Sequence, residues 1–90
     1  MLYSVQLSPH AVRQYKKLDP AIRSRIEAGI DALRHTPLEG PHIKRLKGRL
    51  HAYHRCRIGD YRIVYAVAHH DRIVYVDYIQ HRKDVYRGIE

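Results

Sequence analysis

The amino-acid sequence predicts an α+β domain in the order β-α-α-β-β-β, with a helical hairpin packed on one face of an antiparallel sheet. Three observations predict this fold. Helical periodicity of apolar residues is confined to the first forty positions, strand-like alternation dominates positions 51–81, and short turns separate the strands. Because ninety residues suffice for one small domain, residues 1–90 are treated as a single unit.

The N-terminal segment predicts a strand followed by a helix. Residues 2–7, "LYSVQL", alternate apolar and polar side chains, which is typical of a strand. Ser8 followed by Pro9 marks a helix start, because the hydroxyl can cap the first turn and proline lacks an N–H that would be unpaired there. We expect this helix to continue to about Leu18.

A second helix begins with the same signal. Asp19 is followed by Pro20, and Thr36 followed by Pro37 ends the pattern. Four apolar residues between these points fall at helical spacing and form one stripe, which we expect to face the core: Ile22, Ile26, Ile30 and Leu33.

Residues 38–49 are expected to form a loop that carries a basic ridge, with Leu46 pointing inward. The ridge residues are Lys44, Arg45, Lys47 and Arg49. Three strands and a short tail then follow, with the strands at residues 51–58, 61–69 and 72–81. The short turns between them predict an antiparallel meander.

Strand alternation predicts where the polar side chains of this meander lie. Arg55 and Arg57 share one face of their strand, and Arg62 belongs to the polar face of the next. The opposite face has the apolar residues that the helices need, so the arginines are expected on the uncovered face of the sheet. Tyr78 or Arg82 could join them there. The apolar face is expected to include Cys56, Ile58, Ile63 and Val67, with Cys56 as a buried, inert thiol.

Composition narrows the class of function. The net charge is +8, and residues 41–90 contribute +6 of it (eleven basic and five acidic residues). A concentrated positive region favours a polyanionic partner such as RNA or DNA, and a merely solvated surface is the alternative. With one cysteine, no long apolar run and no signal-peptide pattern, we expect a soluble cytoplasmic domain. The eight histidines show no metal-ligand spacing, so neither a metal nor a cofactor is expected.

The order of these elements, with "LKG", "RCRIGDYRIVYAV" and "IQHRKDVYR" along the chain, resembles the RelE toxins of the RelE/ParE superfamily of type II toxin–antitoxin systems. The resemblance covers nearly the whole chain. It implies a ribosome-dependent endoribonuclease that cleaves mRNA in the ribosomal A site, inhibits translation, and is held by a cognate, RelB-like antitoxin, which charge complementarity suggests is acidic. ParE proteins share the fold and poison DNA gyrase, so a non-catalytic gyrase inhibitor is one alternative. A non-catalytic basic RNA-binding module is another.

The resemblance also implies a set of site residues. Arg62 in "GDYRIVY" matches the strand arginine of the RelE active site, and Arg82 and Tyr86 match the arginine and tyrosine of its C-terminal segment. Arg55 and Arg57 stand where the best-studied members have lysines. Arginine does not lose its proton in practice, so Tyr86 or one of two neighbouring histidines is the better candidate for proton transfer. Those histidines are His54 and His81.

The remaining basic residues are expected to hold RNA phosphates: Arg55, Arg57, Lys44, Lys47 and Arg49. A structural role is the alternative for several of these positions. Arg62 could be the ion-pair partner of Asp60 or Asp77, and Tyr86 could be a packing anchor. Tyr61 and Tyr65 are expected in the core.

Overall fold

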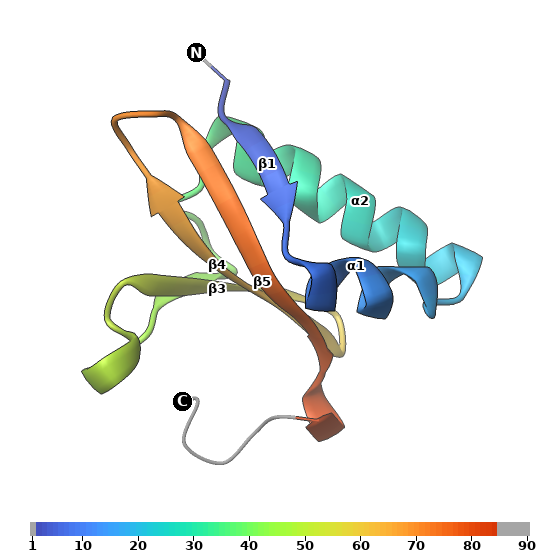
Figure 1. Cartoon of the computed structure of the whole chain (residues 1–90). Coiled ribbons are helices and arrows are strands. Elements are labelled where there is room, and N and C mark those ends of the chain that lie inside the picture. Colours follow the sequence, from blue (N-terminus) through green and yellow to red (C-terminus); the bar gives the residue numbers. More distant parts are fainter. Residues whose placement is uncertain (1, 85–90) are drawn as a thin grey trace.

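The computed structural model describes residues 2–84. It contains two α-helices, five strands and two short 3₁₀ turns (Figure 1). Their bounds are β1 Ser4–Leu7, α1 Pro9–Lys16, α2 Pro20–His35, β2 Ile43–Arg45, β3 Tyr53–Ile58, β4 Tyr61–Ala68 and β5 Ile73–His81, with the 3₁₀ turns η1 Gly48–Leu50 and η2 Arg82–Asp84. The predicted α+β class and helical hairpin are confirmed.

The sequence predicted an antiparallel sheet, but the sheet in the structure is mixed. Its strand order is β1-β5-β4-β3-β2. The neighbours from β5 to β2 are antiparallel, but β1 lies parallel to β5. The chain connects these two strands through both helices and the other three strands, which provides the long connection that a parallel pair requires. Alternation along β1 places its side chains but carries no information on its direction relative to a partner.

The segment predicted as a loop contains the edge strand β2 and the turn η1. Ile43 pairs with Cys56 of β3, and its side chain packs against the core cluster. The strand is only three residues long and two of them are basic, so the sequence lacked an alternating apolar pattern there. Pairing with β3 and burial of one isoleucine explain why the segment is extended.

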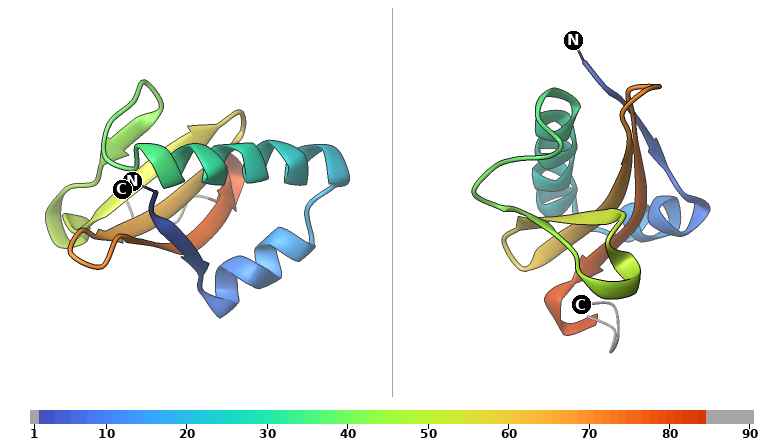
Figure 2. Two further views of the ribbon diagram at one scale, coloured as in Figure 1. Left: turned by 90° about the horizontal axis from the view of Figure 1, so that it is seen from above. Right: turned by 90° about the vertical axis from the view of Figure 1, so that its left-hand side faces the viewer.

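The helices begin where the prolines predicted. Ser8 caps α1 by accepting a hydrogen bond from the backbone N–H of Ala11 (3.0 Å), and Ala11 is fully buried. In α2 the predicted stripe faces the core, with Ile26 and Leu33 buried and the other two isoleucines packed beside them. Helix α2 lies across one face of the twisted sheet, and α1 follows the end of β1 and lies next to β5 (Figure 2).

The start of α1 also completes the edge of β5 where β1 ends. The Ser8 hydroxyl donates to the carbonyl of Asp77 (2.8 Å), and the N–H of Ile79 donates to the side-chain Oε1 of Gln14 (2.8 Å). Without β1 beside them, these backbone groups would need other partners. The N-terminal segment therefore holds the second half of β5 in place.

The core lies between α2 and the helix-facing side of the central strands. Tyr65 is completely buried, and its hydroxyl donates to the carbonyl of Pro37 (2.5 Å), so the ring fills the core while its polar tip is paired. Cys56 is buried as predicted, and burial raises the pKa of its thiol. No helix within residues 2–84 is long and apolar enough to cross a membrane.

Candidate active site

Two cross-strand pairs of like charge lie on the sheet face opposite α2. Arg57 of β3 stands directly opposite Arg62 of β4, and Lys44 of β2 stands directly opposite Arg55 of β3. Like charges in this position destabilise a sheet. An anion bound between the side chains would offset that repulsion, so both pairs are candidate anion sites.

The Arg57–Arg62 pair lines a hollow of about 240 Å³, which we call the arginine hollow. A third guanidinium, that of Arg82, also lines it, together with Asp60 of the β3–β4 turn. Arg82 is tied to this turn because its backbone N–H donates to the carbonyl of Asp60 (2.7 Å). Gly59 has φ +58°, a conformation that glycine adopts without strain, and it lets the turn stay short enough to bring the three arginines together.

The hollow is strongly cationic despite its one carboxylate. Asp60 forms an ion pair with Arg82 at 3.7 Å between Oδ1 and Nε, and both side chains are about two-thirds exposed (64% and 66%). An exposed pair at that distance contributes little energy. Three positive charges around one hollow suit a phosphate group, whose oxygens an arginine can bind through two parallel hydrogen bonds.

The Lys44–Arg55 pair belongs to a second basic hollow of about 160 Å³ at the edge of the sheet. Its lining residues are Lys44, Arg45, Leu46, Lys47 and Arg55. Arg49, predicted as a further phosphate contact, is exposed on the adjacent turn η1. The predicted RNA-binding residues are therefore distributed between the two hollows and η1, with Arg57 beside Arg62.

The histidines proposed for proton transfer lie outside the arginine hollow. His54 stacks on Tyr65 with ring centroids 5.7 Å apart, on the helix-facing side of the sheet. Burial, followed by the charges of Arg45 and His69, lowers the pKa of His54. His81 packs edge-on against Tyr61 at 5.0 Å. The structure does not bring His54 to the three arginines, and Tyr86 lies outside the described residues.

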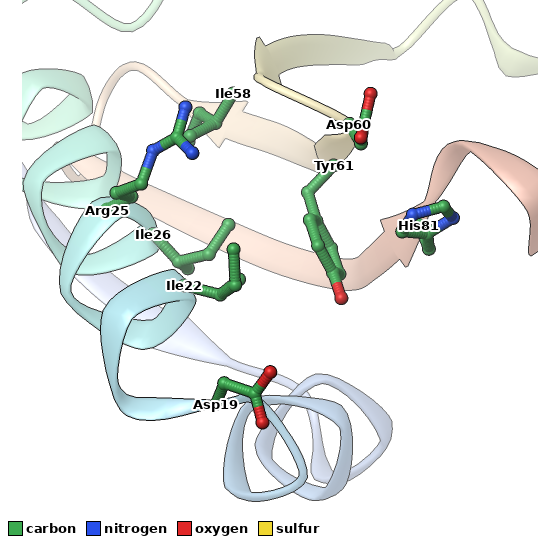
Figure 3. Close-up of a pocket in the computed structure, with 8 residues that line it drawn as sticks. All are labelled: Asp19, Ile22, Arg25, Ile26, Ile58, Asp60, Tyr61 and His81. Atoms are coloured by element: carbon green, nitrogen blue, oxygen red, sulfur yellow. The ribbon is translucent and has the colours of Figure 1, made fainter.

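A third hollow, of about 260 Å³, lies between α2 and the β3–β4 turn. Figure 3 shows Ile22 and Ile26 projecting from α2 toward Tyr61, with His81 on the far side of the tyrosine ring. Tyr61 and Asp60 line this hollow and the arginine hollow alike. His81 therefore lines the third hollow and not the one that the three arginines line.

A known protein family matches most of this sequence. The family model described as "ParE toxin of type II toxin-antitoxin system, parDE" matches residues 5–86.

The chain is a toxin of the RelE/ParE superfamily.

Its relatives place this toxin beside RelE. A curated protein of Methanocaldococcus jannaschii, "Putative toxin RelE1", is 33% identical over 90 residues, spanning 98% of this chain and 99% of that protein. The toxin of the RelBE2 complex from Mycobacterium tuberculosis shares 28% identity at a TM-score of 0.80, over 91% of this chain and all of that one. The RelE of the Pyrococcus horikoshii RelE–RelB complex shares 25% identity at a TM-score of 0.77, over 94% of this chain and all of that one. Isolated Escherichia coli RelE, at 18% identity and a TM-score of 0.76, shares the fold.

Sequence reasoning missed one residue of this toxin's site region. Gln80 stands opposite Arg62 in the register of β4 and β5, and its side chain is buried (1% exposed). Within residues 2–84 neither its Nε2 nor its Oε1 has a hydrogen-bond partner, which is costly for a buried amide. Alternation in β5 could have located it, because Gln80 and Tyr78 are two residues apart and share a face.

The face opposite α2 is also less open than alternation predicted. Val64 lies on it between Arg55 and Tyr78 but is only 2% exposed. The arginines of this toxin thus surround a partly covered centre and do not lie on a flat, solvated sheet.

Proposed function

We propose that this toxin is an endoribonuclease that cleaves mRNA on the ribosome. The proposal rests on the hollow that Arg57, Arg62 and Arg82 line. It lies where β3 ends, β4 begins and β5 ends. Two of these charges face each other at a cost to the sheet, which is expected of a site built for a charged substrate and not for stability alone. The similarity to RelE proteins along the whole chain supports an RNA phosphate as that substrate.

The proposed reaction needs no nucleophile from the protein. The 2′-hydroxyl oxygen of the RNA forms a bond to the adjacent phosphorus, and the bond from phosphorus to the 5′-oxygen breaks. The products are a 2′,3′-cyclic phosphate and a 5′-hydroxyl, so one proton leaves the 2′-oxygen and one is taken up by the 5′-oxygen. The arginines hold the phosphate in line for attack and stabilise the extra negative charge of the transition state. In this proposal Arg62 is the main phosphate ligand, and Arg82 contacts the leaving 5′-oxygen.

Proton transfer is assigned to groups other than the arginines, which stay protonated at any physiological pH. We propose Tyr86 for this role, with His81 as the alternative because it precedes Arg82 and borders the same turn. An isolated phenol has a pKa near 10, so a base role for Tyr86 requires cationic neighbours that stabilise the phenolate.

The proposed partners follow from the family and from charge. The M. tuberculosis and P. horikoshii relatives were solved as toxin–antitoxin complexes. We propose that this chain likewise has a cognate RelB-like antitoxin, with an acidic segment suited to the +8 charge of the toxin. The basic edge hollow and Arg49 would contact phosphates of mRNA or ribosomal RNA, and action on ribosomes would place the toxin in the cytoplasm.

Primer extension on a translated mRNA tests the activity. Wild-type toxin should produce stops within codons, and Arg62→Ala should lower cleavage by at least about 100-fold, the scale of losing one charge-stabilising group in an active site. Arg13→Gln removes a charge from the exposed surface of α1 and should cleave like wild type. RNA binding by a wild-type toxin that leaves the mRNA intact would instead indicate a non-catalytic RNA-binding module.

A ParE-like inhibitor of gyrase is the second candidate, because the matching family model is described as a ParE toxin. The two activities separate in one pair of assays. Gyrase-trapped DNA breaks in the presence of intact mRNA would support the ParE-like function and refute the endoribonuclease.

A further inference from the structure

A groove of about 680 Å³ lies between α2 and the end of β3, and we call it the helix-side groove. It is larger than the arginine hollow (680 against 240 Å³), so it has room for several side chains of a partner. Neither the proposed cleavage nor the basic edge hollow uses it. The residues that line it come from α2, from β3 and from the segment before β2: Arg25, Ala28, Gly29, His42, Arg57 and Ile58.

The floor of the helix-side groove is apolar because α2 and β3 approach each other closely there. Gly29 has no side chain, and Ile58 fills the space, since a Cβ on Gly29 would clash with the Ile58 side chain. Ala28 is exposed beside them and adds one methyl group. The groove therefore presents aliphatic carbon to solvent, which favours contact with apolar side chains of a partner.

The rim of the helix-side groove is cationic. Arg25 reaches from α2 toward Ile58 (Figure 3), and its guanidinium lies against the β3–β4 turn, where a Cβ on Gly59 would be 2.9 Å from Arg25 Nη2. Arg57 and His42 border the groove as well, and none of the described residues that line it is acidic. Within residues 2–84 neither arginine forms an ion pair. Two arginines beside an aliphatic floor favour an acidic, partly apolar partner.

The helix-side groove and the arginine hollow share one arginine. Arg57 and Gly59 line both, whereas Arg25 lines the groove and not the arginine hollow. An acidic side chain that binds Arg57 from the groove would withdraw one of the three guanidinium groups on which the proposed RNA site depends. Binding in the groove and binding of RNA would therefore oppose each other, and each would weaken the other by the same factor.

We infer that the helix-side groove binds an acidic, amphipathic segment of the antitoxin, with apolar side chains on the floor and a carboxylate between Arg25 and Arg57. The segment thus inhibits the toxin through Arg57 without covering the arginine hollow. RNA suits the groove less well, because the floor has aliphatic carbon and no tyrosine ring on which a base could stack. This inference rests on the antitoxin and the RNA site proposed above.

Two labelled synthetic peptides of about four helical turns are the probes, and fluorescence anisotropy measures their binding. In the glutamate peptide, leucines recur at helical spacing with glutamates beside them, and in the glutamine peptide each glutamate is replaced. Wild-type toxin should bind the glutamate peptide at least about ten-fold more tightly, the scale of one hydrogen bond to a charged group. Arg25→Gln should weaken that peptide at least about five-fold and leave RNA affinity within about two-fold, because Arg25 does not line the arginine hollow.

Two substitutions on α2 form a matched pair. Ala28→Glu and Ala21→Glu add the same charge at exposed positions, but only Ala28 lines the helix-side groove. The new carboxylate of Ala28→Glu stands three residues after Arg25 and repels those of the glutamate peptide, so affinity should fall at least about ten-fold. Ala21 lies about 10 Å away along the helix, so Ala21→Glu should bind within about two-fold of wild type. Circular dichroism establishes that each variant is folded, and Arg25→Gln suffices if Ala28→Glu is not.

Competition tests the role of the shared arginine. Saturating glutamate peptide should weaken RNA binding at least about five-fold in wild-type toxin, and by a smaller factor in Arg57→Gln, because Arg57 carries the coupling. RNA binding that the peptide leaves unchanged in wild-type toxin would refute inhibition through Arg57.

Three further outcomes overturn the inference. The first is equal affinity for the two peptides, and the second is a glutamate peptide that binds Ala28→Glu and Ala21→Glu alike. The third is weaker RNA binding by Arg25→Gln and Ala28→Glu with unchanged peptide binding, which would make the groove an RNA contact. Failure of the proposed function is separate, because peptide binding that depends on Arg25 and Ala28 in a toxin that leaves mRNA intact refutes the endoribonuclease and supports the groove.

Discussion

Replacing Arg57 by glutamine should make the toxin more stable and a weaker RNA binder. Arg57 is exposed and stands directly opposite Arg62, so removing its charge relieves repulsion within the sheet. Directly opposite Cβ atoms are about 5 Å apart. With the two guanidinium groups splayed to about 7 Å in water, Coulomb's law gives about 0.6 kcal/mol. At physiological salt the Debye length is about 8 Å, so screening reduces the repulsion to roughly 0.25 kcal/mol.

That free energy is measurable in a domain of this size. At low salt, the stabilisation of about 0.6 kcal/mol raises Tm by roughly 2–5 °C. Thermal unfolding followed by circular dichroism should show this increase at low salt and little of it at 1 M NaCl, where the Debye length is only about 3 Å. Arg13→Gln, which removes an equal charge from α1, should leave Tm nearly unchanged.

The same variant should lose RNA affinity. Removing a charge-assisted phosphate contact should weaken binding by about ten-fold, and it should reduce the slope of log K against log salt by about 0.7, the value for one phosphate on a single strand. An Arg57→Gln protein that is less stable than wild type at low salt, or that binds RNA equally well with an unchanged salt slope, would refute the assignment of the Arg57–Arg62 pair as an anion site.

Three further predictions concern the scaffold. Ser8→Ala removes both the cap of α1 and the hydrogen bond to the carbonyl of Asp77, and should lower the unfolding free energy by about 1–2 kcal/mol in a urea titration; a loss below about 0.3 kcal/mol would contradict this role. Tyr65→Phe leaves the buried carbonyl of Pro37 without its donor and should cost about 1–2 kcal/mol, with the wild-type strand content retained by circular dichroism. The folded state lowers the pKa of His54, chiefly by burial, so the unfolded chain binds that proton more readily and stability should fall as pH drops below about 6.5. His54→Gln should flatten the dependence of Tm on pH between pH 7 and 5, and an equally steep or steeper dependence would show that His54 is not responsible.

The helices of this toxin were predictable because their signals are local. Proline after a capping residue marks a helix start whatever surrounds it, and the four-residue stripe of α2 faces the core because one helix face must be buried. Strand alternation likewise placed Arg55, Arg57 and Arg62 on the face opposite α2. These predictions concern residues close in sequence, for which neighbours set the geometry.

In residues 38–49, local sequence signals were not enough to predict the structure. Its strand β2 extends because β3 is next to it and Ile43 finds space in the core, and neither condition is visible in three residues of which two are basic. The parallel pairing of β1 with β5 has the same origin, since a strand's partner and direction depend on hydrogen bonds to distant residues.

By itself, then, the sequence determined the class of fold, the face on which the arginines lie and the motifs that resemble RelE toxins. The tertiary structure alone decided that Arg57 stands opposite Arg62, that Arg82 completes the same hollow, and that His54 lies elsewhere. It also decided the bulge in β5, where Asp77 lies between the partners of Val64 and Tyr65. The physical reason is that alternation within one strand specifies which face each side chain occupies. Register depends on how two strands pair with each other, which the alternation within either strand does not specify.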